Sequence, residues 1–179
     1  MTVMACVRFR LLPVFLLAVL LAGCHRQGGL AIGDPAPSVT LLDFRGNTVK
    51  FPDDFKGKVV LVRFWSVDCG FCNKDRLSDL EHFHQKYKSR RFLPVAVNVG
   101  RVEASDERFN RFGHLSYPLL IDEYGLAARR FGVIGLPATF VIDGEGILRA
   151  KKTGEAELDE LKKFFTTVLN KGDFYEGYF

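Results

Sequence analysis

VVLVRFWSVDCGFC, residues 59–72, is the stretch from which the fold and the chemistry can both be argued. Its first half, VVLVRFW (59–65), is a short run of apolar and β-branched residues, which predicts a buried β-strand. Cys69 and Cys72 follow at once, separated by two residues. That spacing suits a redox disulfide, a metal site or a peroxide-reactive thiol, and the rest of the chain must decide among them.

A helix is predicted to follow the two cysteines directly. Residues 72–90 carry apolar side chains three or four positions apart, at Leu77, Leu80, Phe83 and Tyr87. The free N–H groups and the positive dipole end of such a helix would stabilise a thiolate at Cys69. A thiolate attacks disulfides, and Cys72, about one turn away, could then resolve the mixed disulfide.

The remaining pattern alternates strands with helices. We expect a hairpin (38–43 and 48–51), a short helical turn (51–57), a strand (92–99), helical segments (106–112 and 123–131) around an extended stretch (117–121), two strands (138–143 and 147–152) and a closing helix (155–170). The tail, 171–179, has no predicted structure. This order predicts an α/β fold with a central sheet and helices on both faces.

The first residues look like an export signal. Arg8 and Arg10 precede an apolar stretch of twelve, residues 11–22, which is short for a membrane span and typical of a signal peptide. The stretch ends in Leu-Ala-Gly-Cys, which resembles the bacterial lipobox. That resemblance implies cleavage after residue 23 and a lipid on Cys24.

The mature protein is therefore expected outside the cytoplasm, lipid-anchored to a bacterial membrane. A signal peptide (1–23) and a tether (24–34) would precede one domain (35–170). With 47% hydrophobic and 26% charged residues the domain is expected to be globular. The net charge of +4 falls to +2 without Arg8 and Arg10, so we expect no nucleic-acid partner.

The cysteines can be sorted by their expected fates. Cys6 leaves with the signal and Cys24 takes the lipid, so Cys69 and Cys72 remain as thiols. A disulfide that closes so small a loop removes little chain entropy. The pair is therefore expected to serve chemistry rather than stability.

Two motifs together resemble those of thioredoxin-like thiol–disulfide oxidoreductases. FWSVDCGFC is similar to the usual FWATWCGPC, and GLPATFVID is similar to the later G-x-P-x-T-F. The opening IGDPAPSVTLLDFRGNTVKF resembles the N-terminal hairpin of the TlpA-like, AhpC/TSA–redoxin branch. The likeness covers Ile32 to Leu169 and implies a thioredoxin-like fold: a central mixed sheet flanked by helices, with an N-terminal hairpin and a central helical insert.

The resemblance also implies roles for particular residues. Cys69 would be the attacking nucleophile and Cys72 the resolving thiol, with no cofactor and no metal. Pro137 would be a cis-proline that faces them, and Leu136 would offer backbone hydrogen bonds to a substrate chain. Tethered members include the reductases that keep apocytochrome c thiols ready for haem attachment. Protein disulfides are thus the expected substrates, and a membrane thiol-transfer protein the expected reductant.

The sequence departs from the family pattern at positions that can tune a thiolate. Arg63 stands where thioredoxins carry a buried acid, and either lowers the thiolate pKa or pairs with a carboxylate. Asp68 replaces the usual tryptophan before the nucleophile and should oppose the thiolate. Asp75 matches an acid proposed as a proton shuttle in some tethered reductases, or is a helix-start acid. Phe71 replaces the proline between the cysteines.

Three other functions were weighed against disulfide exchange. A zinc site lacks a second CxxC, and His82 and His84 would point about 200° apart on a helix. A thiol peroxidase of the peroxiredoxin type finds a serine at Ser66, three before Cys69, but Val62 where it needs a proline. A non-catalytic binding module would leave the CxxC idle.

Overall fold

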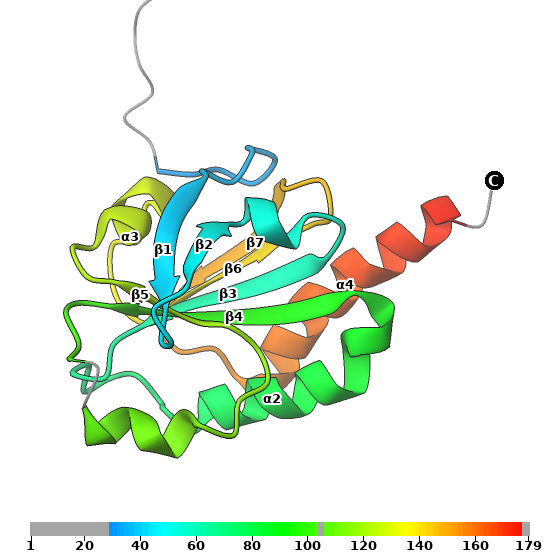
Figure 1. Cartoon of the computed structure of the whole chain (residues 1–179). Coiled ribbons are helices and arrows are strands. Elements are labelled where there is room, and N and C mark those ends of the chain that lie inside the picture. Colours follow the sequence, from blue (N-terminus) through cyan, green and yellow to red (C-terminus); the bar gives the residue numbers. More distant parts are fainter. Residues whose placement is uncertain (1–28, 104–105, 177–179) are drawn as a thin grey trace, which may run out of the picture.

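The structure of the protein, a computed structural model, describes residues 29–103 and 106–176. Within these residues seven strands form one sheet, in the order β2-β1-β5-β4-β3-β6-β7 (Figure 1). They are β1 (Val39–Asp43), β2 (Thr48–Phe51), β3 (Val59–Trp65), β4 (Phe92–Val99), β5 (Leu119–Asp122), β6 (Ala138–Ile142) and β7 (Leu148–Thr153). The β3–β4 and β4–β5 pairs are parallel, and the other pairs are antiparallel. The mixed sheet and the N-terminal hairpin confirm the expected fold.

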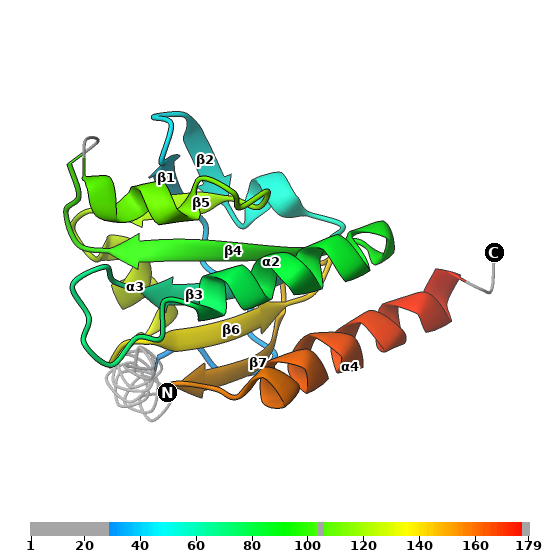
Figure 2. The ribbon, with the colours of Figure 1, turned by 90° about the horizontal axis from the view of Figure 1, so that it is seen from below.

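Helices cover both faces of this sheet. The two longer ones, α2 (Arg76–Tyr87) and α4 (Leu158–Glu176), lie on the same face, as Figure 2 shows. The short α3 (Leu126–Phe131) lies on the opposite face (Figure 1). The described part of the chain also has three 3-10 turns: η1 (Asp53–Phe55), η2 (Lys88–Arg90) and η3 (Glu107–Phe112), the last forming the expected insert.

Strand β3 lies inside the sheet, between β4 and β6, and all seven of its residues are buried. Because successive side chains of a strand point to opposite faces, β3 contributes to two different cores. Phe64 packs against Phe131 of α3 and Phe140 of β6, at ring-centroid distances of 5.3 and 5.7 Å. Its neighbours Arg63 and Trp65 face the side covered by α2 and α4. The charged residue in VVLVRFW is thus enclosed by the core.

The core under α2 and α4 is largely aromatic and aliphatic. Phe165 of α4 stacks on Phe92 of β4 with ring centroids 4.1 Å apart. Leu77 and Leu80 of α2 are fully buried beside them. The apolar face predicted for residues 72–90 therefore does face the sheet.

Both ends of the expected domain differ from the prediction. Near the start, Gly33 N–H donates to Leu148 O and Ala36 N–H to Gly146 O, each at 2.8 Å, and Pro35 forms a bridge with Ile147. Residues 33 and 34, expected in the tether, are therefore bonded to the domain. At the other end α4 begins at Leu158 rather than 155 and continues to Glu176, into the expected tail.

The expected signal peptide with Cys6, and Cys24 with its expected lipid, lie outside the described residues. Within residues 29–103 and 106–176, none of the helices combines the length and the apolar character that crossing a bilayer requires.

Candidate active site

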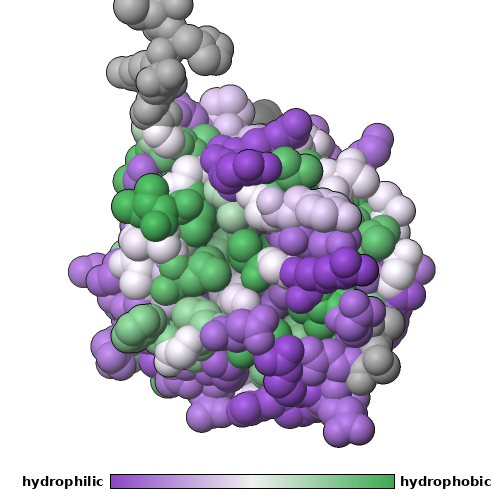
Figure 3. Space-filling view, turned by 90° about the vertical axis from the view of Figure 1, so that its left-hand side faces the viewer, coloured by the Kyte–Doolittle hydropathy of each residue, from purple (hydrophilic) through white to green (hydrophobic). Residues whose placement is uncertain are grey.

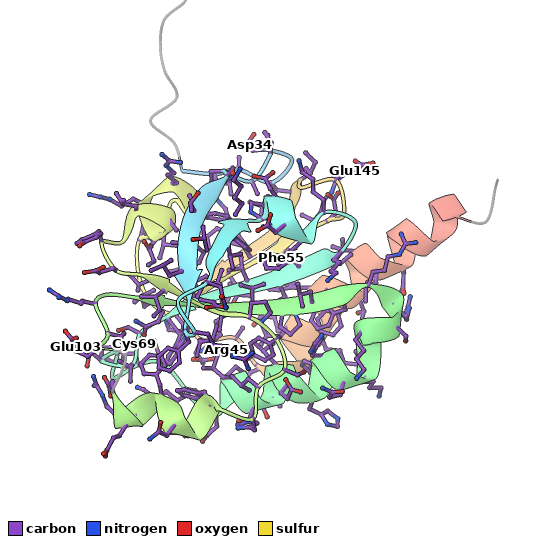
Figure 4. All side chains as sticks on the ribbon, in the orientation of Figure 1. Asp34, Arg45, Phe55, Cys69, Glu103 and Glu145 are labelled. Atoms are coloured by element: carbon purple, nitrogen blue, oxygen red, sulfur yellow. A yellow bond between two sulfur atoms is a disulfide. The ribbon has the colours of Figure 1, made fainter. Side chains whose placement is uncertain are left out.

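The two cysteines lie in the loop that follows β3, at one end of the sheet. Figure 4 shows Cys69 at the opposite end from Glu145, which lies in the β6–β7 turn. Phe64, near the end of β3, is in register with Ala138, the first residue of β6. Because the two strands are antiparallel, Pro137 emerges from the sheet at the same edge as the cysteine loop. The two motifs quoted from the sequence therefore meet in space.

Cys69 and Cys72 are joined by a disulfide, with their Cα atoms 5.4 Å apart. Their surroundings differ. Cys69 is half-buried, whereas Cys72 has only 4% of its surface exposed and belongs to the hydrophobic core. A partner molecule can therefore reach the sulfur of Cys69 far more readily than that of Cys72.

The predicted start of the helix at Cys72 is wrong, because α2 begins at Arg76. The intervening backbone is held by side chains instead. Asn73 Oδ1 accepts from the N–H of Asp75 at 3.0 Å, which makes a turn before the helix, and Lys74 Nζ donates to Cys69 O at 2.6 Å. The Cys69 N–H donates to Ser66 O at 3.1 Å. Cys69 thus does not lie at the first turn of the helix, where the helix dipole would act most strongly on its thiolate.

Asn98 anchors the start of this loop, and the sequence analysis did not single it out. Its side chain is 1% exposed at the end of β4. Asn98 Oδ1 accepts from the N–H of Val67 at 2.9 Å, and its Nδ2 donates to Gly100 O at 3.1 Å. A buried amide with both ends bonded fixes the chain where it leaves β3. The signal was a lone polar residue in the apolar run FLPVAVNV.

Arg63 is fully buried and its head finds a carboxylate, as one of the two interpretations expected. Arg63 Nη2 lies 2.9 Å from Glu155 Oε1 and 2.7 Å from Oε2. Arg63 comes from β3, and Glu155 from the loop before α4, 92 positions later. The second interpretation, an effect on the thiolate, stays a prediction.

Glu155 connects this buried cation to the cysteine loop. Its Oε2 accepts from the N–H of Asn73 at 3.1 Å, and its Oε1 lies 3.4 Å from Arg76 Nε. Burial alone would raise the pKa of Glu155, but the bonds to Arg63, Asn73 and Arg76 outweigh it and hold that pKa below its usual range. Glu155 is therefore an anion at neutral pH. The sequence pattern predicts only the start of a helix at this position.

Asp68 and Asp75, expected to tune the thiolates, are both exposed and paired with the insert. Asp68 Oδ1 accepts from Arg108 Nη1 at 2.6 Å, and Asp75 Oδ1 accepts from Arg111 Nη2 at 2.7 Å. Each acid beside the cysteines thus meets a guanidinium from η3. The pairing partly offsets the negative charge that Asp68 was expected to place beside Cys69.

Aromatic side chains fix the insert against the same end of the sheet. Phe109 and Phe112 of η3 are both buried and pack against Trp65, with ring centroids 5.9 and 5.2 Å apart. Trp65 is the last residue of β3, four positions before Cys69. The insert therefore borders the cysteine loop, and its two arginines had no recognisable signal in the sequence.

Pro137 is preceded by a cis peptide bond, as expected for that position. Leu136 is half-buried beside it. Two large apolar side chains in these loop segments are exposed to solvent. Phe71, between the two cysteines, is 91% exposed, and Ile134, three positions before Pro137, is 90% exposed.

The residues weighed for other functions have structural contacts. The Ser66 hydroxyl accepts from the N–H of Asp68 at 3.2 Å. His84 and His114 each lie within hydrogen-bonding distance of a serine hydroxyl, Ser116 and Ser78. In the part of the chain that the structure describes, three or more metal-ligating side chains do not gather at any one place.

Comparison with known proteins places this site in a family. Residues 32–151 match the AhpC/TSA family. The chain belongs to this family. Among curated relatives, the thiol-disulfide oxidoreductase ResA of Geobacillus kaustophilus is 30% identical over 140 residues, which cover 78% of this chain and 79% of the relative. The thioredoxin-like protein YneN of Bacillus subtilis is 28% identical and covers 77% of this chain and 81% of its own.

Solved structures show the same relationship. A thiol:disulfide interchange protein DsbE from Chlorobium tepidum superposes with a TM-score of 0.70 at 29% identity, over 79% of this chain and 99% of that one. The thioredoxin domain of a thiol-disulfide oxidoreductase from Bacteroides vulgatus gives 0.63 at 27% identity, over 76% and 99%. This AhpC/TSA member is accordingly a thioredoxin-like thiol–disulfide oxidoreductase.

Proposed function

We propose that the protein reduces disulfides in other proteins, with Cys69 as the attacking thiol and Cys72 as the resolving thiol. The observation that carries this assignment is the unequal burial of two bonded cysteines. Cys69 is half-buried at the surface, while Cys72 is 4% exposed beneath it. The Cys69 thiolate can therefore reach a disulfide of another protein, whereas Cys72 is sheltered and suited to an intramolecular step.

The reaction balances as two exchange steps. The Cys69 thiolate attacks one sulfur of the substrate disulfide, which forms a mixed disulfide and releases the first substrate thiolate. The Cys72 thiolate then attacks Cys69, which re-forms the Cys69–Cys72 disulfide and releases the second. Two electrons pass from the enzyme dithiol to the substrate, and an external dithiol must return them before the next cycle.

The surroundings of the cysteines favour a protein as the substrate. Phe71 and Ile134 offer exposed apolar contacts, and the half-buried Leu136 offers its backbone beside Pro137. Figure 3, which views the left-hand side of Figure 1, shows apolar surface among hydrophilic residues. By contrast, a groove of about 780 Å³ lies at β1, β5 and α3, and the residues that line it include neither cysteine. We infer that a substrate chain lies across the loops rather than in that groove.

The site of action is proposed to be outside the cytoplasm. The Leu-Ala-Gly-Cys sequence favours a lipid on Cys24 and tethering to a bacterial membrane. In such an oxidising compartment the dithiol needs a reductant, for which we propose a membrane protein that transfers thiol electrons from the cytoplasm. The resemblance of the two motifs to the tethered reductases of apocytochrome c favours apocytochrome c as a substrate and cytochrome c maturation as the pathway.

The redox state of the two thiols in living cells tests this direction of electron flow. Cells that express the full chain are quenched in acid, and free thiols are labelled with a maleimide that changes the electrophoretic mobility. The Cys69→Ser/Cys72→Ser double variant gives the unlabelled reference, and treatment with a strong reductant gives the fully labelled one. A reductase should be found mostly in the dithiol form. A mostly oxidised pair would contradict reduction and point to an oxidant or a peroxidase.

A further inference from the structure

Two opposite charges hold the backbone of the residue that follows Cys72. Glu155 Oε2 accepts from the N–H of Asn73 at 3.1 Å, and Arg63 Nη2 lies 3.5 Å from the carbonyl oxygen of the same residue. The two charged groups are themselves 2.7 Å apart. The amide nitrogen of Asn73 belongs to the peptide bond that begins at Cys72. Standard bond lengths keep it within roughly 5 Å of the Cys72 sulfur.

The charge at this position is not fully neutralised. Nε and Nη1 of Arg63 are buried and have no hydrogen-bond partner among the described residues, and neither does the hydroxyl of Thr139, which is opposite Arg63 in the register of β6. Arg76, 7% exposed, brings a second guanidinium to Glu155. Its other partners, Asp79 at 3.2 Å and Glu157 at 3.9 Å, are more exposed than Glu155. Two buried cations, Arg63 and Arg76, therefore share the partly buried carboxylate of Glu155 beside the Cys72–Asn73 peptide.

We propose that Arg63 and Glu155 are positioning residues of the redox centre, which hold the Cys72–Asn73 peptide and act with opposite sign on the stability of the Cys72 thiolate. This inference rests on the proposed use of the two cysteines as a redox pair. Arg63 favours the dithiolate side of the exchange equilibrium, and Glu155 opposes it. The ion pair thus sets how readily the Cys69–Cys72 disulfide accepts two electrons from an external dithiol.

The size of the effect follows from the distance and the burial. A unit charge roughly 8 Å from a sulfur, at the effective dielectric of a partly buried site, changes an ionisation equilibrium by about ten- to thirtyfold. The peripheral pairs of the molecule are more exposed and more strongly screened. A change at Arg63 or Glu155 should therefore exceed the same change at a surface pair.

The test is the equilibrium constant between the disulfide and dithiol forms in buffers of reduced and oxidised dithiothreitol, read by acid quenching and mass spectrometry of alkylated protein. Glu155→Gln keeps an oxygen that can accept from Asn73 but loses the charge, and should favour the dithiol by about tenfold. Arg63→Gln should favour the disulfide by about tenfold. The double variant should return to within threefold of the unaltered protein.

Glu160→Gln is the matched control, because Glu160 pairs with Lys152 at 2.9 Å and is 34% exposed, close to the 27% of Glu155. It should change the constant by less than twofold. Shifts of the two single variants in the same direction, or no larger than that of the control, would overturn the inference. A merely structural ion pair would lower the stability of both variants without this opposition of sign.

A variant that does not fold is replaced by Arg76→Gln, which removes the second cation from the same carboxylate. It should favour the disulfide by about threefold, and an unchanged constant would count against the inference. If the unaltered cysteines do not exchange with dithiothreitol at all, the proposed function fails. If they exchange but the variants behave like the control, only the role of the ion pair fails.

Discussion

The inner and outer sides of the cysteine loop carry the same kind of ion pair in opposite surroundings. On the inner side Arg63 and Glu155 lie 2.7 Å apart, with side chains 0% and 27% exposed. On the outer side Arg108 and Asp68 lie 2.6 Å apart, with side chains 54% and 67% exposed. The distances are almost equal, so the difference in strength expected between the two pairs comes from their burial.

The difference separates two ways of holding a reactive loop. On the inner side Arg63 is closed off from water, so its charge depends on the carboxylate of Glu155. On the outer side water can replace either partner, and exposed pairs contribute little. The outer side depends instead on Phe109 and Phe112, which pack against Trp65. Aromatic packing of Phe109 and Phe112 therefore holds the insert in place, while Arg108 and Arg111 offset the charges of Asp68 and Asp75 at the surface.

The largest effect on stability is expected from removal of the buried cation. Arg63→Gln removes the buried cation whose Nη2 contacts both oxygens of Glu155, and should lower the free energy of unfolding of the disulfide form by about 3–5 kcal/mol. Urea unfolding followed by the fluorescence of Trp65 measures it. The matched change on the outer side, Arg108→Gln, should cost less than about 1 kcal/mol. Equal losses would remove the distinction between the two sides.

Acid should remove the contribution of Glu155 to the free energy of unfolding. Its pKa lies below the usual value of about 4.3, so the unfolded chain binds this proton first as the pH falls. The stabilisation is complete above about pH 4.3 and is lost as the pH drops through the lower folded-state value. The difference in unfolding free energy between the protein and Glu155→Gln should thus shrink below pH 4. Comparison with the variant is necessary because Asp43 and Glu81 also have lowered pKa values.

Phe109→Ala should lower the free energy of unfolding by about 3 kcal/mol, less than the loss expected for Arg63→Gln. The Phe109 ring is 2% exposed and also stacks on Phe44, with ring centroids 4.6 Å apart. Arg111→Gln in the same turn should cost a few tenths of a kcal/mol and lose even that in 1 M salt. Thermal or urea unfolding at two salt concentrations compares the pair. A larger loss for the arginine would mean that charge, not aromatic packing, holds the insert.

The sequence was sufficient where the signal was local. The apolar run of β3 and the CxxC next to it predicted the strand, its burial and the redox loop. The G-x-P-x-T-F element predicted that a second loop would reach the same edge. The first two features depend on residues that are close together in the chain, whereas the meeting of the two loops was implied by the family resemblance.

The parts that were missed depend on contacts between distant segments. Glu155 meets Arg63 across 92 positions, and the insert arginines meet acids 36 and 40 positions away, so pattern and spacing carry no sign of these pairs. The start of α2 was predicted too early for a related reason. The side chain of Asn73 accepts from the N–H of Asp75, and that of Glu155 accepts from the N–H of Asn73. These contacts stabilise a turn in a segment whose apolar spacing favoured a helix.

The most direct test of the central claim, that Cys69 attacks and Cys72 resolves, is to trap the mixed disulfide. The reduced variants Cys72→Ser and Cys69→Ser, which each keep one thiol of the pair, are incubated with a protein disulfide, quenched in acid and examined by mass spectrometry. The account predicts a stable adduct joined through Cys69 in Cys72→Ser, and little or none in Cys69→Ser, where the remaining thiol is buried. An adduct that forms equally well through Cys72, or in neither variant, would contradict it.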